Sequence, residues 1–154
     1  MLNQKKTIKK GNARFDVKSI KNKGRITSRR VVHIAEDLSW NYGSDVVVYD
    51  VRSKSPFVSY FVVCSAANKE RLKALNNAAR ETLYDNYKTI DHTEGKNDSQ
   101  WILIDAKDVV VHLFTKEERE HFALDERYQD CPHKVVRAKK EPVYRKKKRR
   151  NMAE

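Results

Sequence analysis

The clearest pattern in the chain is a pair of apolar runs within residues 100–114, separated by a short polar break. The runs Trp101–Ile104 and Val109–Phe114 are rich in β-branched and aromatic residues, and Asp105–Asp108 lies between them. This arrangement predicts a tight antiparallel hairpin. Neither run alternates cleanly between apolar and polar positions, so we expect both strands to be covered on both faces, at the centre of a sheet.

Apolar spacing also predicts the elements that precede the hairpin. Residues 28–42 have the spacing of an amphipathic helix, and Gly43 supplies a stop signal. Residues 45–51 and 60–65 are short β-branched runs, which indicates two buried strands. Asn68 is expected to cap the next helix, whose apolar stripe runs to about Leu83.

Three further segments have weaker patterns. Residues 87–92 alternate around Ile90 and are predicted to form an edge strand. Thr115 and Glu118 have the spacing of a capping box, which predicts a short helix to about Leu124. We expect the domain to end at Cys131-Pro132, since residues 134–150 are basic and contain Pro142.

The predicted order of elements defines the fold class. The order is helix, strand, strand, helix, three strands and a helix. It predicts one α/β domain with a mixed sheet of about five strands flanked by helices. A chain of 154 residues has room for such a domain and two tails. We therefore expect a basic N-terminal extension at residues 1–27, the domain at 28–132 and a basic C-terminal tail at 133–154.

The charge is unevenly distributed between these parts. Residues 1–30 contain eleven Lys or Arg and one acid, and residues 133–154 contain ten against two, so the ends carry +10 and +8. Since the whole chain is +12, residues 31–132 carry −6. Basic tails attract polyanions by counterion release, whereas an acidic domain favours a basic partner. A ribosome offers both surfaces, although lysine richness also simply favours solubility.

Cysteine content and hydropathy bear on location. Two cysteines, Cys64 and Cys131, are too few for a disulfide framework and favour a reducing compartment. No apolar run approaches the roughly 20 residues that span a bilayer, and the start of the chain lacks the apolar segment of a secretory signal. We expect a cytoplasmic protein. A mitochondrial or plastid location is the alternative, because residues 1–30 are basic and nearly free of acids.

Catalytic patterns are weak in this sequence. It lacks a Gly-rich phosphate loop and paired metal-binding cysteines. Glu118 and His121 have a spacing found in di-metal sites, but no partner motif accompanies them. Gly43-Ser44 before a strand is similar to nucleotidyltransferases, yet Asp45 and Asp50 are five apart and point to opposite strand faces. We therefore expect no enzyme activity, no cofactor and no metal.

Several segments together resemble one family, the ribosomal silencing factors, also called RsfS or Iojap. They are Asp45–Val51, Tyr60–Ser65, Glu94-Gly95, Trp101–Asp105, Asp108–His112 and Glu118–Glu120, in order within residues 31–132. The resemblance implies a nucleotidyltransferase-like α/β fold without catalytic acids. It also implies binding to the large ribosomal subunit at its fourteenth ribosomal protein, which blocks joining of the small subunit and represses translation.

The resemblance further implies the docking residues, which are Tyr60, Glu94, Trp101, Asp105, Asp108 and His112. Trp101 is expected to anchor the contact, and the three acids to bind Lys or Arg of the ribosomal protein. Tyr60 and His112 are expected to support that surface. The chain departs from the family pattern at Ser59, at Lys107 where many relatives have glycine, and at residues 124–128.

The tails lie outside the resemblance, and we expect them to contact ribosomal RNA. The candidate residues are Lys5, Lys6, Lys9, Lys10, Arg145, Lys146, Lys147, Lys148, Arg149 and Arg150. Two other functions remain open. One is a large-subunit assembly factor, bacterial or organellar, that uses the same docking site, and the more remote one is a metal-dependent nucleotidyltransferase. A homodimer off the ribosome also remains open.

Overall fold

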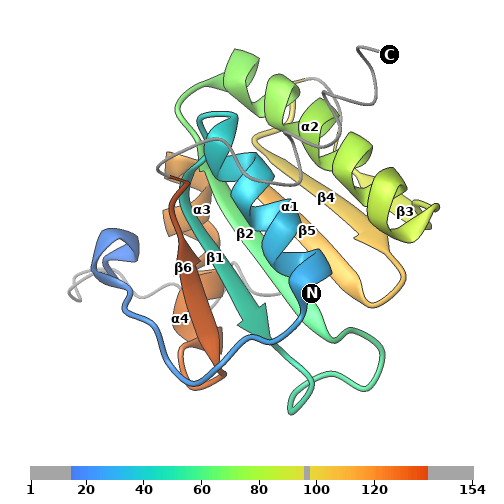
Figure 1. Cartoon of the computed structure of the whole chain (residues 1–154). Helices are drawn as coiled ribbons and strands as arrows, with labels where there is room; N and C mark the ends of the chain where they lie inside the picture. The colour runs from blue at the N-terminus through green and yellow to red at the C-terminus, as the bar shows by residue number, and fades with distance from the viewer. Residues whose placement is uncertain (1–14, 96–97, 139–154) are drawn as a thin grey trace.

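A mixed six-stranded sheet with helices on both faces organises the protein (Figure 1). The computed structural model describes residues 15–95 and 98–138. The sheet order is β3-β4-β5-β2-β1-β6. Its strands are β1 (Ser44–Asp50), β2 (Tyr60–Ala66), β3 (His92–Glu94), β4 (Trp101–Ala106), β5 (Val109–Thr115) and β6 (His133–Val136). Its α-helices are α1 (Arg29–Trp40), α2 (Lys69–Tyr87), α3 (Lys116–Phe122) and α4 (Leu124–Tyr128).

The strand directions confirm the mixed sheet. β2 and β5 run parallel, while the other neighbouring pairs among the described strands run antiparallel. A parallel pair needs a long crossover, and here α2, β3 and β4 supply it. The predicted hairpin is formed by β4 and β5, which are joined at Lys107-Asp108. β5 lies in the middle of the sheet next to β2, whereas β4 is one strand from the edge.

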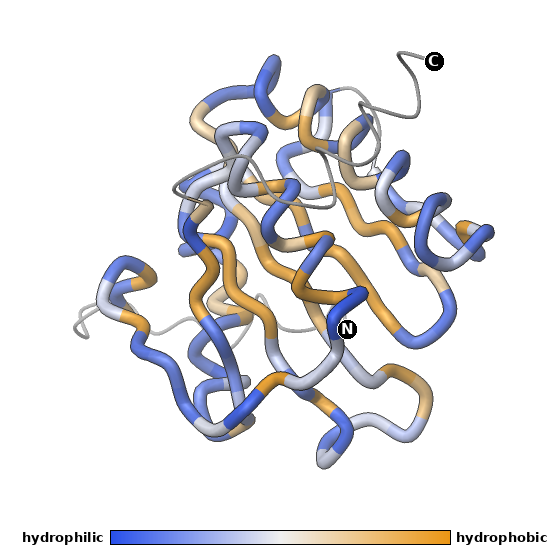
Figure 2. Tube along the Cα trace, in the orientation of Figure 1, coloured by the Kyte–Doolittle hydropathy of each residue, from blue (hydrophilic) through white to orange (hydrophobic). Residues whose placement is uncertain are grey.

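The two helices that cover one face of the sheet, α1 and α2, are the two long helices that the sequence predicts. Ser28 caps α1 by accepting from the Val31 amide, and Asn68 caps α2 by accepting from the Arg71 amide at 2.8 Å, as predicted for Asn68. Apolar residues concentrate along the strands beneath these helices (Figure 2). Gly43 permits the close approach of α1 to β2, because an added Cβ would lie 2.4 Å from the Cys64 sulfur.

The opposite face is covered by the short helices α3 and α4. The Thr115 hydroxyl accepts from the Glu118 amide at 3.3 Å, which confirms the predicted N-cap. Arg119 is 1% exposed and forms an ion pair with Asp125, with 2.8 Å between Nε and Oδ2. The Tyr49 hydroxyl donates to the second oxygen of Asp125 at 2.6 Å. This buried network fixes both helices to β1.

The predicted strand at residues 87–92 is wrong. α2 continues to Tyr87, whose ring is 9% exposed, and ends at Lys88 in the left-handed conformation with φ 64°. Glycine usually occupies such a position, so the sequence carried no stop signal there. The edge strand at this point is β3, three residues long and shifted to His92–Glu94.

The sheet also extends past Pro132, where we expected packed structure to end. β6 pairs antiparallel with β1 through four register pairs, from Val46 opposite Val136 to Tyr49 opposite His133. This correction raises the strand count from five to six. The strand is short and mixes apolar with basic residues, so its pattern is hidden within the basic composition. Among the described residues, no helix is long and apolar enough to cross a membrane.

Candidate functional site

Cross-strand register places four of the expected docking residues on one face of the sheet. Glu94 lies opposite Leu103, and Leu103 lies opposite His112. Trp101 and Asp105 are each two positions from Leu103 along β4. Directly opposed residues share a face, and alternate residues of a strand share a face. Glu94, Trp101, Asp105 and His112 therefore lie on the side that carries α3 and α4.

An aromatic cluster forms the buried base of this face. The Trp101 ring stacks on Phe114 with 5.3 Å between ring centroids and lies 4.4 Å from the Phe122 ring of α3. Its indole nitrogen donates to Nδ1 of His112 at 3.3 Å. The indole is partly buried, so one side of it packs in the protein while the rest reaches the surface. Such a rigid, partly exposed ring is typical of an interface anchor.

His112 is part of the base and not of the accessible surface. It is fully buried, and burial lowers the pKa of its imidazole to about 3. The ring is therefore neutral at physiological pH, which fits its acceptance of the Trp101 hydrogen bond at Nδ1. A role of His112 in supporting a docking surface stays a prediction.

Carboxylates lie along β3 and at the β4–β5 turn, and Trp101 lies on the same face at the other end of β4. Glu94 is exposed, and its carboxylate lies 3.6 Å from Nε2 of His92. Asp105 is partly buried, and burial together with the nearby Asp91 raises the pKa of its carboxyl group, while His92 opposes this shift. Residues 91–108 hold five acids against two lysines. We call Asp91, Glu94, Asp105, Asp108 and the exposed part of Trp101 the acidic surface.

Glycine and an unusual turn position this surface. Gly95 has φ +99°, and an added Cβ would lie 2.4 Å from the Trp101 carbonyl oxygen, so glycine lets the β3–β4 loop approach the start of β4. Lys107 adopts φ 55° in the β4–β5 turn, and its amide donates to a carboxylate oxygen of Asp91 at 2.8 Å. Asp108 is exposed in this turn. Burial raises the pKa of Tyr87 at the end of α2 to about 12, and the charge of Asp108 adds to this shift.

Tyr60 lies apart from the other expected docking residues. Its side chain is 8% exposed and packs in the core beneath α1 and α2, on the opposite face of the sheet. Its amide donates to the Asp108 carbonyl oxygen at 3.1 Å, so its backbone supports the turn. Any contribution of the Tyr60 side chain to docking would therefore act through packing.

Sequence reasoning missed two residues of this region. Asp91 was assigned to a predicted strand, yet its carboxylate caps the β4–β5 turn. Phe57 is 88% exposed in the loop that follows β1, and the neighbouring Ser59 amide donates to the Asp108 carbonyl oxygen at 2.7 Å. Ser53, Ser55 and Pro56 are typical of a loop, but nothing in the sequence indicates that this loop lies beside the hairpin turn.

Of the two acids considered for a nucleotidyltransferase site, Asp45 and Asp50, one lies near the start of β1 and the other at its end. Asp50 accepts two hydrogen bonds from the guanidinium of Arg52, which keeps the pKa of this carboxyl below its usual value. Within residues 15–95 and 98–138, no group of three or more His, Cys, Asp and Glu is placed to hold a metal ion. The tail residues proposed to contact RNA, Lys5–Lys10 and Arg145–Arg150, lie outside the described residues.

A mixed six-stranded sheet with helices on both faces defines a single α/β domain, here with several acids at the β3 edge and the β4–β5 turn. The family model described as "Ribosomal silencing factor during starvation" matches residues 25–154. The chain belongs to this family.

Named relatives agree with this assignment. The Bacillus subtilis protein "Ribosomal silencing factor RsfS" is 28% identical over 88 residues, which cover 57% of this chain and 75% of the relative. The Haemophilus influenzae protein of the same name is 29% identical over 96 residues, covering 62% and 93%. The Zea mays "Protein Iojap, chloroplastic" is 27% identical over 97 residues, covering 63% and 42%.

Two solved structures share the fold. A crystal structure from Bacillus halodurans has a TM-score of 0.60 at 23% identity and covers 71% of this chain and all of the other. A Chromobacterium violaceum structure has a TM-score of 0.61 at 23% identity and covers 77% and 98%.

Proposed function

We propose that this protein is a ribosomal silencing factor that docks on the large ribosomal subunit and prevents the small subunit from joining. The observation that carries the proposal is the acidic surface of a chain that belongs to the silencing-factor family. Several carboxylates and one anchored indole suit a basic protein partner, because charge-assisted hydrogen bonds add to burial of an aromatic ring. We propose the fourteenth large-subunit protein as that partner.

The mechanism is steric and needs no reaction. Once the acidic surface is bound to its partner, the rest of the domain projects from the large subunit. It then occupies space that the small subunit requires. For such a factor, affinity and position determine the effect. We therefore propose that the protein is not an enzyme and that it acts in the cytoplasm, in keeping with its bacterial relatives. The similarity to chloroplastic Iojap supports an organellar location as the alternative.

Subunit joining measured with purified components tests the proposal. Large subunits are incubated with this protein, small subunits are added, and light scattering follows the formation of joined ribosomes. We expect the protein to lower both the rate and the extent of joining when it is added first. Unchanged joining at a protein concentration that saturates co-sedimentation with large subunits would overturn the steric mechanism.

A role in large-subunit assembly that uses the same docking site is the second candidate. Sucrose-gradient profiles of cells lacking the gene separate the two functions. Accumulated large-subunit precursors favour assembly, whereas normal precursors with excess joined ribosomes under starvation favour silencing.

A nucleotide-incorporation assay tests the alternative that the protein is a metal-dependent nucleotidyltransferase. That alternative would be supported if activity appeared and was lost in both Asp105→Ala and Asp108→Ala.

A further inference from the structure

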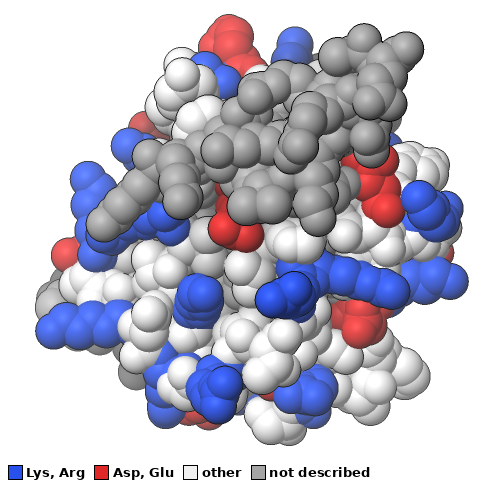
Figure 3. Space-filling model, viewed as in Figure 1, with Lys and Arg blue, Asp and Glu red and all other residues white. Residues whose placement is uncertain are grey.

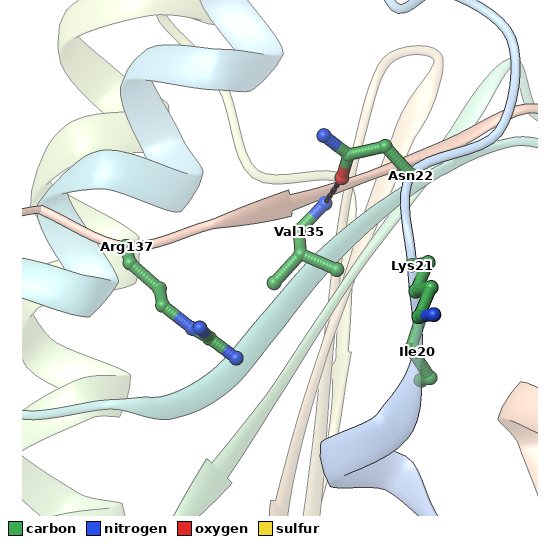
Figure 4. Close-up of a pocket in the computed structure, with 5 residues that line it drawn as sticks. All are labelled: Ile20, Lys21, Asn22, Val135 and Arg137. Carbon is green, nitrogen blue, oxygen red and sulfur yellow. Dashed lines mark hydrogen bonds between the residues drawn. The ribbon is translucent and has the colours of Figure 1, made fainter.

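The segment before α1 is attached along the outer edge of β6. The Lys23 amide donates to the His133 carbonyl oxygen at 2.9 Å, and the His133 amide donates back to the Lys23 carbonyl oxygen at 2.8 Å. Asn22 accepts from the Val135 amide through its side-chain oxygen at 2.8 Å (Figure 4). Ile20 is 7% exposed and packs against the α3–α4 face of the sheet. The segment therefore has a defined position beside the edge strand.

The buried His133 side chain also contacts the segment before α1. It is 2% exposed, and its ring nitrogens lie 2.8 Å from the carbonyl oxygens of Cys131 and Lys21. The contact with Lys21 joins residues 112 positions apart in the sequence. The side chains that project outward from the segment and from β6 are consequently held next to each other.

Nearly all of the charge at this edge is positive. Within residues 15–26 and 133–138 one acid occurs, Asp16, and its carboxylate accepts from the Lys18 amide at 3.0 Å. Six basic side chains lie in the same ranges, and all are exposed: Lys18, Lys21, Lys23, Arg25, Lys134 and Arg137. We call these six residues the basic edge. Figure 3 shows Lys and Arg side chains along this side of the molecule.

These cations are available to an external anion. Among the described residues, none of the six forms an ion pair. Asp130, whose charge interacts with Lys23, is already bound to Lys54 at 2.8 Å. Lys23 makes a smaller contribution to lowering the pKa of Asp130, after the hydrogen bond from Lys54.

The surface between these side chains is hollowed into two neighbouring shallow grooves. The first, of about 390 Å³, is lined by Lys21 and Arg137 on either side of Val135 (Figure 4). The second, of about 240 Å³, is lined by Arg25 and Lys134, and Asn22 borders both. Because the Asn22 oxygen already accepts from Val135, its amide nitrogen is free to donate outward.

We infer that the basic edge binds the phosphate backbone of RNA. Phosphate oxygens in nucleic-acid complexes are contacted by Lys and Arg side chains and by amide donors. The basic edge offers both kinds of group, beside grooves that are open to solvent. An acidic protein is a poorer match, because the grooves offer little apolar area for the aromatic anchors of a protein interface. The family match begins at residue 25, so three of the six cations precede it.

The position of the basic edge allows RNA and a protein partner to bind together. The acidic surface lies at β3 and the basic edge at β6, on opposite ends of the six-stranded sheet. Five strand spacings place these ends about 24 Å apart. If the proposed docking on the large subunit is correct, the RNA is ribosomal RNA beside the docking site. Binding to RNA itself does not depend on that proposal.

Fluorescence anisotropy with the full chain and a labelled 20-nucleotide RNA, with no ribosome present, tests the inference. The variant Lys21→Gln/Lys134→Gln/Arg137→Gln removes three cations from the basic edge. The control Lys69→Gln/Lys73→Gln/Lys88→Gln removes three exposed cations from α2 and its end. Both variants keep the basic tails and have the same net charge, so any difference between them reports position.

We expect the basic-edge variant to bind RNA at least tenfold more weakly than the unmodified chain at low salt, and the control to stay within about twofold. The slope of log affinity against log salt should fall by about 2 for the basic-edge variant, since each lost phosphate contact of a single strand contributes about 0.7. Equal losses in the two variants, or no loss in either, would overturn the inference. A basic-edge variant that keeps its RNA affinity but loses binding to anionic vesicles would assign the surface to membranes instead. Trp101→Ala should leave RNA affinity unchanged, which separates this surface from the proposed docking site.

Discussion

Trp101 and His112 are joined by a hydrogen bond from the indole nitrogen to Nδ1 of the imidazole, at 3.3 Å, across the β4–β5 hairpin. The acceptor role of Nδ1 requires a proton on Nε2 in the neutral ring, so this contact also sets the tautomer of His112. The pair connects the surface where we propose that the partner binds to the core beneath it.

Replacing Trp101 by alanine should weaken binding to large subunits by about 2 kcal/mol or more, roughly 30-fold, because a half-buried indole at an interface centre is typically a hot spot. Co-sedimentation at low protein concentration measures the effect. Trp40→Ala is the matched control, since Trp40 is 38% exposed at the end of α1, on the other side of the sheet. Equal binding of the two variants would remove Trp101 from the docking site.

The strands and helix caps could be predicted because their signals are local. β1, β2, β4 and β5 are dense in β-branched residues, and Asn68 and Thr115 are standard caps, so each was recognisable without knowledge of its neighbours. β6 could not be predicted in this way. Its pairing depends on β1, which is distant in sequence, and on His133, whose ring nitrogens come within 2.8 Å of two carbonyl oxygens only after folding.

The candidate site was predictable in composition but not in geometry. Alternation along β4 places Trp101 and Asp105 on the same face, but only the register of β3 brings Glu94 to them. Tyrosine is common among interface anchors, yet the alternation of side chains along β2 places Tyr60 on the face covered by α1 and α2. Sequence reasoning had no information on that register, because it follows from pairing with β5.

His112 should make folding stability depend on pH in the mildly acidic range. Its pKa is lowered to about 3 in the fold by burial, against about 6.5 in an unfolded chain. Between these values the unfolded chain binds a proton that the native protein does not, so the free energy of unfolding falls as pH decreases. Between pH 7.5 and 5 this loss should be about 2 kcal/mol, from a slope of about 1.4 kcal/mol per pH unit.

Urea unfolding at several pH values measures this dependence, and His112→Gln should reduce it, because glutamine does not titrate. The window stops at pH 5 so that carboxylates with lowered pKa, such as Asp50, do not contribute. His121→Gln is the control, since His121 is exposed on α3. A pH dependence that is the same in His112→Gln and His121→Gln would show that His112 is not its source.

The buried ion pair between Arg119 and Asp125 should be the most sensitive polar contact in the core. Burial alone would raise the pKa of Asp125, but the charge of Arg119 and hydrogen bonds from Arg119 and Tyr49 keep it below its usual value. Asp125→Asn leaves the guanidinium buried without its counter-charge, which typically costs about 3–5 kcal/mol. Thermal and urea unfolding measure this loss.

Asp130→Asn is the matched control for that change. Asp130 forms an ion pair with Lys54 at the same 2.8 Å distance, but its side chain is 70% exposed. Exposed pairs contribute about 1 kcal/mol or less, so the control should retain nearly full stability. If both variants lost a similar free energy of unfolding, burial of the Arg119–Asp125 pair would not explain its contribution to stability.

Lys107 occupies a position in the β4–β5 turn where glycine should be more stable. Its φ of 55° lies in the left-handed region, which costs a residue with a Cβ about 1 kcal/mol relative to glycine. Lys107→Gly should therefore raise the free energy of unfolding by about 0.5–1 kcal/mol, since its greater freedom when unfolded offsets part of the gain. The amide that donates to Asp91 is retained in this variant, so the turn should keep its shape. Lys107→Ala is the control, because it removes the same charge but keeps the Cβ. If alanine stabilised the protein as much as glycine, loss of the lysine charge beside the acidic surface, and not relief of backbone strain, would explain the effect.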